Sequence, residues 1–143
     1  MDKIPIIHGL TDDQLESILG IATKLTFPKD WVIFSEDDVS NDMYILTEGV
    51  LQVTLWGKEI NRLFPIRVVG EMGIFTGEPR SATVVTKTAC TLLRFTKVDL
   101  FSLFEKDKDL YIQFQQGMII DMSEKLRLNN EVIAKLKAKI RSI

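Results

Sequence analysis

The sequence predicts a mainly β protein with flanking helices, in which a double-stranded β-helix (jelly-roll) barrel is followed by a long C-terminal helix. Between about Thr26 and Phe95, short segments rich in Val, Ile, Thr and aromatic residues alternate with turn residues, which is typical of barrels and jelly rolls. Apolar residues at helical spacing precede this region and return after Thr96. A chain of 143 residues, 45% of them hydrophobic, is long enough for one globular core.

The first element is predicted to be an amphipathic helix over about Asp12 to Leu25. Thr11 and Gln14 have the spacing of a capping box, in which the threonine caps the helix and the glutamine reaches back. Apolar residues then recur at helical spacing, at Leu15, Ile18, Leu19, Ala22 and Leu25.

The strands that follow are separated by turns rich in Gly, Pro and Asp. These turns are predicted at Pro28-Lys29-Asp30, Glu36-Asp37-Asp38, Glu48-Gly49 and Trp56-Gly57-Lys58. The segment Tyr44 to Val53 is predicted to be a hairpin that turns at Glu48-Gly49.

Two helices are predicted after the strands. Thr96 and Asp99 mark the start of the first, and Asp107 or Asp109 opens a last helix that continues to the end. We therefore expect residues 1–110 to form the β-roll with its N-terminal and flanking helices, and 111–143 to form a lid or dimerisation helix.

The last helix carries a heptad stripe. Spacings of three and four alternate through Ile119, Met122, Leu126, Asn129, Ile133, Leu136, Ile140 and Ile143. The a positions are Ile119, Leu126, Ile133 and Ile140, and the d positions are Met122, Asn129, Leu136 and Ile143. β-Branched residues at a with leucine at d favour parallel two-stranded coiled coils. A polar Asn129 at one d position lowers stability and fixes the register. We expect a parallel homodimer through 119–143; the alternative is that the stripe packs on the chain's own barrel.

The segment Val69 to Val84 combines a Gly-Glu pair after an apolar strand with a Pro-Arg pair nine residues later. Glu71 offers a carboxylate to ribose hydroxyls, and backbone N–H groups in the Glu71 to Phe75 turn are expected to face an anion. Arg80 supplies a planar cation that matches two phosphate oxygens. This combination predicts a site for a small sugar-phosphate.

The order and spacing of Gly70-Glu71, Pro79-Arg80 and Ala82-Thr83-Val84 resemble the phosphate-binding cassette of the cyclic nucleotide-binding domain family. The Tyr44 to Val53 segment and the strand after the cassette are similar to the family as well, so that residues from about Leu10 to Arg141 fit it. The resemblance implies a sensor of cyclic AMP or cyclic GMP, with cyclic AMP preferred, that signals through its C-terminal helix to an effector the sequence does not identify.

The resemblance and the apolar pattern together assign the ligand-binding residues. In the cassette these are Gly70, Glu71, Met72, Gly73, Arg80, Ser81 and Ala82. Val53 and Leu63 are expected around the base, and Arg127 and Asn130 on the helical lid. The ligand is the nucleotide; no other cofactor is expected.

Composition and motifs exclude several other classes. A net charge of −2 gives no reason to expect a nucleic-acid surface, and no apolar run approaches the length of a membrane span. The single cysteine, Cys90, and the lack of signal-peptide character favour a cytoplasmic protein. With His8 as the only histidine and no phosphate-binding Gly-Lys-Ser/Thr loop, no enzyme or metal site is expected.

Two alternatives stay open at this point. The residues Leu63 to Val69, where the family usually has a Gly-Asp turn, depart from its pattern. Lys125 and Leu126 replace the hydroxyl residues that catabolite activators place against the base. A degenerate member that only dimerises as a scaffold is therefore one alternative. The other is the sensor part of a DNA-binding regulator whose reader domain lies outside this sequence.

Overall fold

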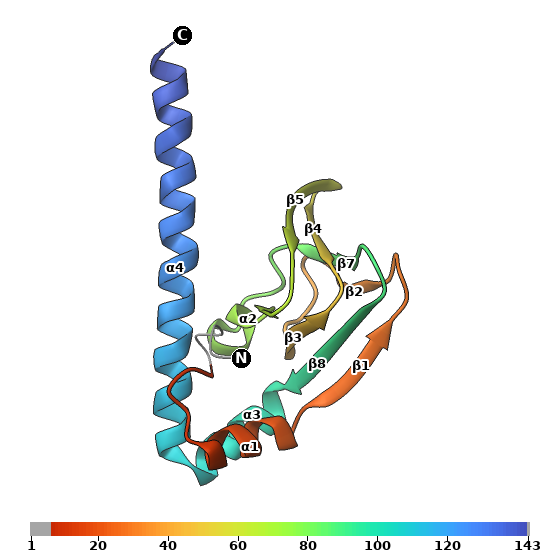
Figure 1. Cartoon of the computed structure of the whole chain (residues 1–143), viewed down its shortest axis with the longest axis vertical. Coiled ribbons are helices and arrows are strands. Elements are labelled where there is room, and N and C mark those ends of the chain that lie inside the picture. The colour runs from red at the N-terminus through yellow and green to blue at the C-terminus, as the bar shows by residue number, and fades with distance from the viewer. Residues whose placement is uncertain (1–6, 143) are drawn as a thin grey trace.

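The computed structural model describes residues 7–142; the placement of 1–6, Ile143 and the side chains of Leu128, Asn129 and Val132 lies outside that description. Two antiparallel four-stranded sheets are flanked by helices (Figure 1). The elements are α1 (Asp12–Gly20), β1 (Thr23–Phe27), β2 (Val32–Phe34), β3 (Asp42–Glu48), β4 (Leu51–Leu55), β5 (Lys58–Leu63), β6 (Arg67–Val69), α2 (Met72–Thr76), β7 (Thr83–Thr86), β8 (Cys90–Thr96), α3 (Lys97–Lys106) and α4 (Lys108–Arg141).

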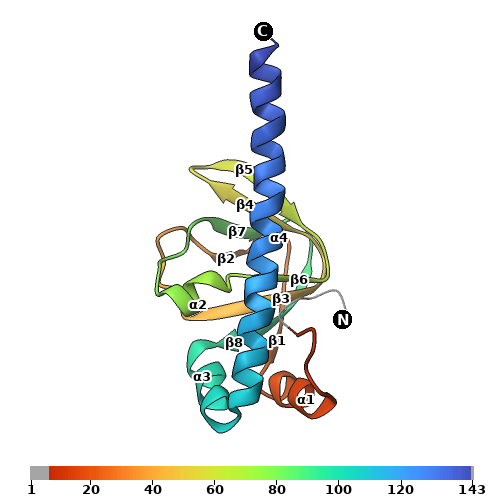
Figure 2. The same cartoon turned by 90° about the vertical axis from the view of Figure 1, so that its left-hand side faces the viewer.

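The two sheets have the strand orders β1-β8-β3-β6 and β2-β7-β4-β5. All of the neighbouring strands are antiparallel. The helices α1 and α3 lie together at one end of the sheets, while α4 passes along the side and extends beyond them (Figures 1 and 2). The predicted mainly β fold with flanking helices and a long C-terminal helix is confirmed; closure of the two sheets into one jelly-roll barrel stays a prediction.

The predicted hairpin at Glu48-Gly49 is wrong, because β3 and β4 belong to different sheets. The chain turns a corner there instead. Gly49 has a φ of +92°, and a β-carbon at this position would lie 2.4 Å from the carbonyl oxygen of Ala89. Glycine is required at the corner because both the left-handed backbone and the close approach exclude a side chain.

The first helix is shorter than predicted. Its capping box is confirmed, since the Thr11 hydroxyl accepts from the Gln14 N–H and the Gln14 side chain accepts from the Thr11 N–H. The helix ends at Gly20, however, and Leu25 lies in β1, paired with Leu92 of β8. Leu25 satisfies the helical period by coincidence; the β-branched Thr23 and Thr26 favour a strand.

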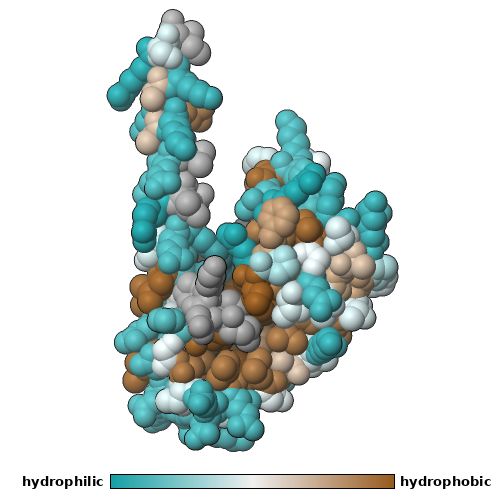
Figure 3. Space-filling model, in the orientation of Figure 1, coloured by the Kyte–Doolittle hydropathy of each residue, from teal (hydrophilic) through white to brown (hydrophobic). Residues whose placement is uncertain are grey.

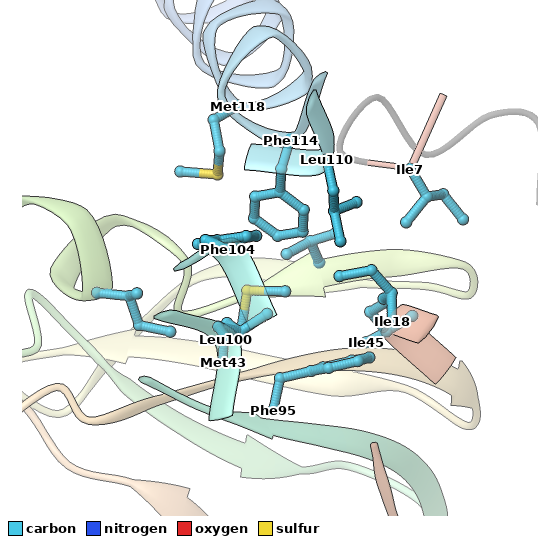
Figure 4. Packing of buried hydrophobic residues seen from close by; sticks show 12 residues of the cluster. Ile7, Ile18, Met43, Ile45, Phe95, Leu100, Phe104, Leu110, Phe114 and Met118 are labelled. Carbon is cyan, nitrogen blue, oxygen red and sulfur yellow. The ribbon is translucent and has the colours of Figure 1, made fainter. Parts of the chain in front are cut away.

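Two clusters of buried apolar side chains make up the core. One lies between the sheets, on β3, β4, β5, β6, β7 and β8. The other joins the first sheet to the helices (Figure 4). Its members include Ile18, Met43, Ile45, Phe95, Leu100, Phe104, Leu110, Phe114 and Met118. The start of α4 is therefore fixed to the body of the protein.

The last helix begins where it was predicted, because the Asp107 carboxylate accepts from the Leu110 N–H. The predicted boundary between 110 and 111 falls within its first turn, and that division stays a prediction. The described side chains of the heptad stripe are exposed. These are Ile119, Met122, Leu126, Ile133, Leu136 and Ile140. Asn129 and Ile143 of the stripe lie outside the described residues.

Exposed charged side chains surround this stripe on the projecting part of α4, which appears mainly hydrophilic in the space-filling view (Figure 3). Among residues 7–142, no helix combines the length and the apolar character needed to cross a bilayer.

Candidate functional site

The cassette connects the end of β6 to the start of β7 and contains the short helix α2. Gly70 opens it with a φ of +79°. A β-carbon on Gly70 would lie 2.3 Å from Nη1 of Arg80. The left-handed backbone and the arginine that crosses it both require glycine here, so the two ends of the cassette, predicted as separate motifs, are in direct contact.

Arg80 points inward and is buried, with its side chain only 4% exposed. Its Nη1 donates to the carbonyl oxygen of Gly70 at 3.0 Å, and its Nη2 donates to the carbonyl oxygen of Asp42 at 2.8 Å and to the Asp42 carboxylate. The ring of Phe34 stacks over the guanidinium, 4.0 Å from Cζ. Backbone hydrogen bonds to Asp37 and Asp38 hold the residue from behind. The arginine is therefore positioned before any ligand arrives.

Asp42 is the hub of a wider network. Its second carboxylate oxygen accepts from Nε of Arg94 at 2.7 Å and from the Tyr44 hydroxyl at 3.0 Å. Burial lowers the pKa of Arg80, and the Asp42 carboxylate opposes that shift. The hydrogen bond to Asp42 raises the pKa of Arg94. Two guanidinium groups therefore share the Asp42 carboxylate, and the Asp38 carboxylate also acts on Arg80.

Two buried side-chain atoms in the described part of the chain have neither a hydrogen-bond partner nor an ion-pair contact: Ser40 Oγ and Arg80 Nε. Each belongs to a residue at or near the cassette. The Ser40 side chain packs against Gly73, where an added β-carbon would lie 2.2 Å from Oγ. Asp121 lies beside Lys125, which bonds to Glu71. Unpaired buried polar atoms are uncommon and require an explanation; their gathering here points to a binding site.

Glu71 is buried as deeply as Arg80, with its side chain 4% exposed. It precedes α2 and forms an ion pair with Nζ of Lys125 on α4. Nζ of Lys125 also lies 3.0 Å from the Asp121 carboxylate, one helical turn earlier. Burial raises the pKa of Glu71 despite the opposing effect of Lys125. The pKa of Lys125 is also raised, because the neighbouring carboxylates Glu71 and Asp121 outweigh its burial.

The two ends of the cassette are in contact, and the other predicted ligand residues lie on β4, β5 and α4. Met72, at the start of α2, and Ser81 are exposed, while Ala82 is half-buried. Leu63 is buried between the sheets and Val53 packs against the same cluster. Arg127 and Asn130 are exposed on α4.

The predicted Glu71 to Phe75 turn is in fact helical, because α2 spans Met72–Thr76.

The sequence analysis missed the partners of the two charged cassette residues. Asp42, Phe34 and Ser40 were not identified, although all three contact the cassette. Lys125 was considered for the base but not for Glu71. The Asp121-Lys125 spacing of four residues was the only local signal, and it is also common on solvent-exposed helices. Within residues 7–142, no group of three or more His, Cys, Asp or Glu side chains is arranged to hold a metal ion.

Comparison with known proteins adds an independent line of evidence. The family described as "Cyclic nucleotide-binding domain" matches residues 24–107, which is more than half of the chain and includes the whole cassette.

Curated relatives cover this region at modest identity. A cGMP-dependent protein kinase of Drosophila melanogaster is 29% identical over 79 residues, which are 55% of this chain and 7% of the kinase. Potassium channel AKT1 of Arabidopsis thaliana is 26% identical over 109 residues, covering 73% of this chain and 13% of the channel. Pycsar effector protein BcPycTIR of Burkholderia cepacia is 28% identical over 111 residues, covering 77% of this chain and 35% of the effector. The chain thus spans about a third or less of these relatives.

Solved structures share the fold. The Catabolite Activator Protein of Thermus thermophilus superposes with a TM-score of 0.78 at 21% identity, covering 93% of this chain and 63% of that protein. The regulatory domain of Toxoplasma gondii PKA, crystallised with cAMP, gives 0.65 at 20% identity, covering 71% of this chain and 40% of that one.

Proposed function

Because this chain belongs to the cyclic nucleotide-binding domain family, we propose that it is a cyclic nucleotide sensor that signals through its long C-terminal helix. The observation that carries the proposal is Arg80. It is buried in the cassette, held by Asp42 and Gly70, and its Nε has no partner among the described residues. A buried cationic N–H without an acceptor fits an anionic ligand.

Charge supports a phosphodiester as that anion. Arg80 and Arg94 share the carboxylate of Asp42, so this carboxylate does not by itself satisfy both guanidinium groups. A cyclic phosphodiester would supply the further anionic oxygens. Glu71 is the proposed partner of the ribose hydroxyls. The base would lie between the β4–β5 strands and α4. Val53 and Leu63 would contact it from the strands, and Arg127 and Asn130 from the helix.

Calorimetric titration of both cyclic nucleotides into the purified protein tests the proposal. We expect Arg80→Ala to weaken binding by about 2–5 kcal/mol, since truncation leaves the partner charge unpaired; this corresponds to roughly 30-fold to several thousand-fold in affinity. Arg80→Lys should not restore binding, because an ammonium cannot reproduce the planar donor set.

Arg62→Ala is the matched control, because Arg62 is an exposed arginine on β5 that pairs with Glu59. It should bind like the wild type. Binding by Arg80→Ala within threefold of the wild type would rule out the phosphate assignment. A wild type that binds neither nucleotide would favour the dimerisation scaffold.

We propose cyclic AMP as the preferred ligand. The difference in binding free energy between cyclic AMP and cyclic GMP is expected not to exceed about 1.4–2.8 kcal/mol, or roughly 10- to 100-fold in affinity. The Ser81 hydroxyl follows the cassette arginine and is exposed, so it permits a hydrogen bond to guanine without demanding one. Selectivity for a polar group arises mainly when the wrong base leaves a buried partner unpaired. Ser81→Ala should therefore weaken cyclic GMP more than cyclic AMP; equal losses, or a wild-type preference for cyclic GMP, would contradict this.

We further propose that the exposed stripe of α4 pairs with the same stripe of a second copy in a parallel coiled coil. Exposed isoleucines recur at a positions on a helix that projects from the sheets, and such residues favour two strands. Light scattering at tens of micromolar protein should report a dimer. A monomer under these conditions would exclude the proposed homodimer, and with it this route of signalling.

A further inference from the structure

The carboxylate of Glu71 is covered in this structure. Its side chain is only 4% exposed, although glutamate side chains are rarely fully buried unless they are paired. The covering element is α4, because Lys125 bonds to Glu71 and Asp121 lies one turn earlier on the same helix. Glu71 therefore offers almost no accessible surface to a ligand hydroxyl while Lys125 stays bonded to it.

The contact between the cassette and α4 is an ion pair between segments that are distant in the sequence. Glu71 and Lys125 are 54 positions apart in the sequence, and Asp121 precedes Lys125 by four. An acidic residue four positions before a lysine on one helix face holds the ammonium in place, and here it aims the ammonium at Glu71. Lys125 is itself one-third exposed, so it can leave Glu71 for water more easily than Glu71 can.

We infer that the Lys125–Glu71 ion pair is an autoinhibitory latch: it holds α4 over the cassette without ligand and has to open before a nucleotide can reach Glu71. The inference rests on the proposed function, since it assigns Glu71 to the sugar. It makes Lys125 a positioning residue that links occupancy of the cassette to the position of α4. Coupling between ligand binding and the position of α4 is reciprocal. A nucleotide that binds better when the ion pair is open therefore also favours the open position of α4.

The first arm of the test contains no nucleotide. Amide hydrogen exchange is measured over residues 119–127 in the wild type, Lys125→Met, Glu71→Gln and the double variant. We expect faster exchange in each single variant. We expect little further change from Lys125→Met to the double variant, because Lys125→Met already removes the contacts of Lys125 with both Glu71 and Asp121. Lys135→Met is the control, since it changes an exposed lysine further along α4. Unchanged exchange in both single variants overturns the latch.

The double variant also guards against misfolding. Lys125→Met alone leaves a buried carboxyl without its cation, whereas the double variant has neither charge and a similar volume. Far-ultraviolet circular dichroism verifies that each variant is folded before its exchange is compared.

The second arm measures nucleotide affinity by calorimetry. Lys125→Met should bind at least about fivefold more tightly than the wild type, which is the lower range of measured couplings between sites. An unchanged or weaker affinity overturns the autoinhibitory role, because Lys125 would then be neutral or would favour the bound state. If no variant and no wild type binds nucleotide, the proposed function fails, while the exchange arm still decides whether the pair holds α4.

Discussion

The two halves of α4 share one continuous helix but have opposite environments. In the first half, Leu110, Phe114 and Met118 are buried against α3 and the first sheet. In the second half, Ile133, Leu136 and Ile140 repeat at similar spacing, yet all three are exposed. Apolar periodicity therefore predicts a helix in both halves, but it does not predict whether either half packs into the core. Whether a stripe becomes core depends on what the rest of the chain places against it.

Leucine-to-alanine substitutions in the two halves of α4 should have different effects on the free energy of unfolding. Leu110→Ala removes a fully buried side chain and should lower the free energy of unfolding by about 2–5 kcal/mol. Leu136→Ala removes an exposed one and should change it by less than about 0.5 kcal/mol. Urea denaturation followed by circular dichroism, at a concentration where the chain is monomeric, measures both. Similar losses in the two variants would mean that the distal half packs on the same chain.

The junction before the buried half should show an intermediate effect. The Asp107 carboxylate accepts from the Leu110 N–H at 3.0 Å. Asp107→Ala should therefore cost about 1 kcal/mol of unfolding free energy, a typical value for loss of an N-cap. Asp107→Asn is the control, because asparagine caps about as well and should keep most of the stability. If the alanine and asparagine variants are equally stable, the cap contributes nothing.

Substitutions in the distal half of α4 are expected to have the smallest effect on the free energy of unfolding and to change dimerisation instead. Ile133→Asp together with Leu136→Asp places charges on the exposed stripe. These substitutions should give monomers by light scattering, because charged residues do not pack in a coiled-coil seam. The thermal unfolding of the monomer should stay close to that of a dilute wild-type sample, and nucleotide affinity should be retained. Retention of a dimer would move the interface away from this stripe.

Local rules predicted much of the fold. The caps at Thr11, Thr96 and Asp107 are present as expected, since a cap depends on residues only three positions apart. The helix that was expected to reach Leu25 ends earlier because the same leucine also fits a strand. The corner at Gly49 could not be distinguished from a hairpin, because which sheet a strand joins is decided by its distant partners.

In the candidate site, too, the residues set by local sequence could be predicted and those set by distant contacts could not. Glu71 and Arg80 could be identified from the cassette because their neighbours lie close in sequence. Their partners could not, because Asp42 is 38 positions from Arg80 and Lys125 is 54 from Glu71. A lone aspartate in a strand and a lone lysine on a helix give no local sign that they neutralise a buried charge. Only the folded arrangement shows that both charged cassette residues are already paired.

The continuity of α4 also has a mechanical meaning. A helix of 34 residues is about 51 Å long at ~1.5 Å per residue. Because its first turns are packed into the core, only the part that follows them can act as a lever. Lys125 lies near its middle, and the distance from there to Ile140 is about 22 Å by the same rise. A tilt of about 5° at Lys125 would therefore displace the far end by about 2 Å. If the proposed latch opens in this way, the release of Glu71 would reach the tip of α4 as a displacement of about 2 Å, enough to shift it against a second helix in the proposed dimer.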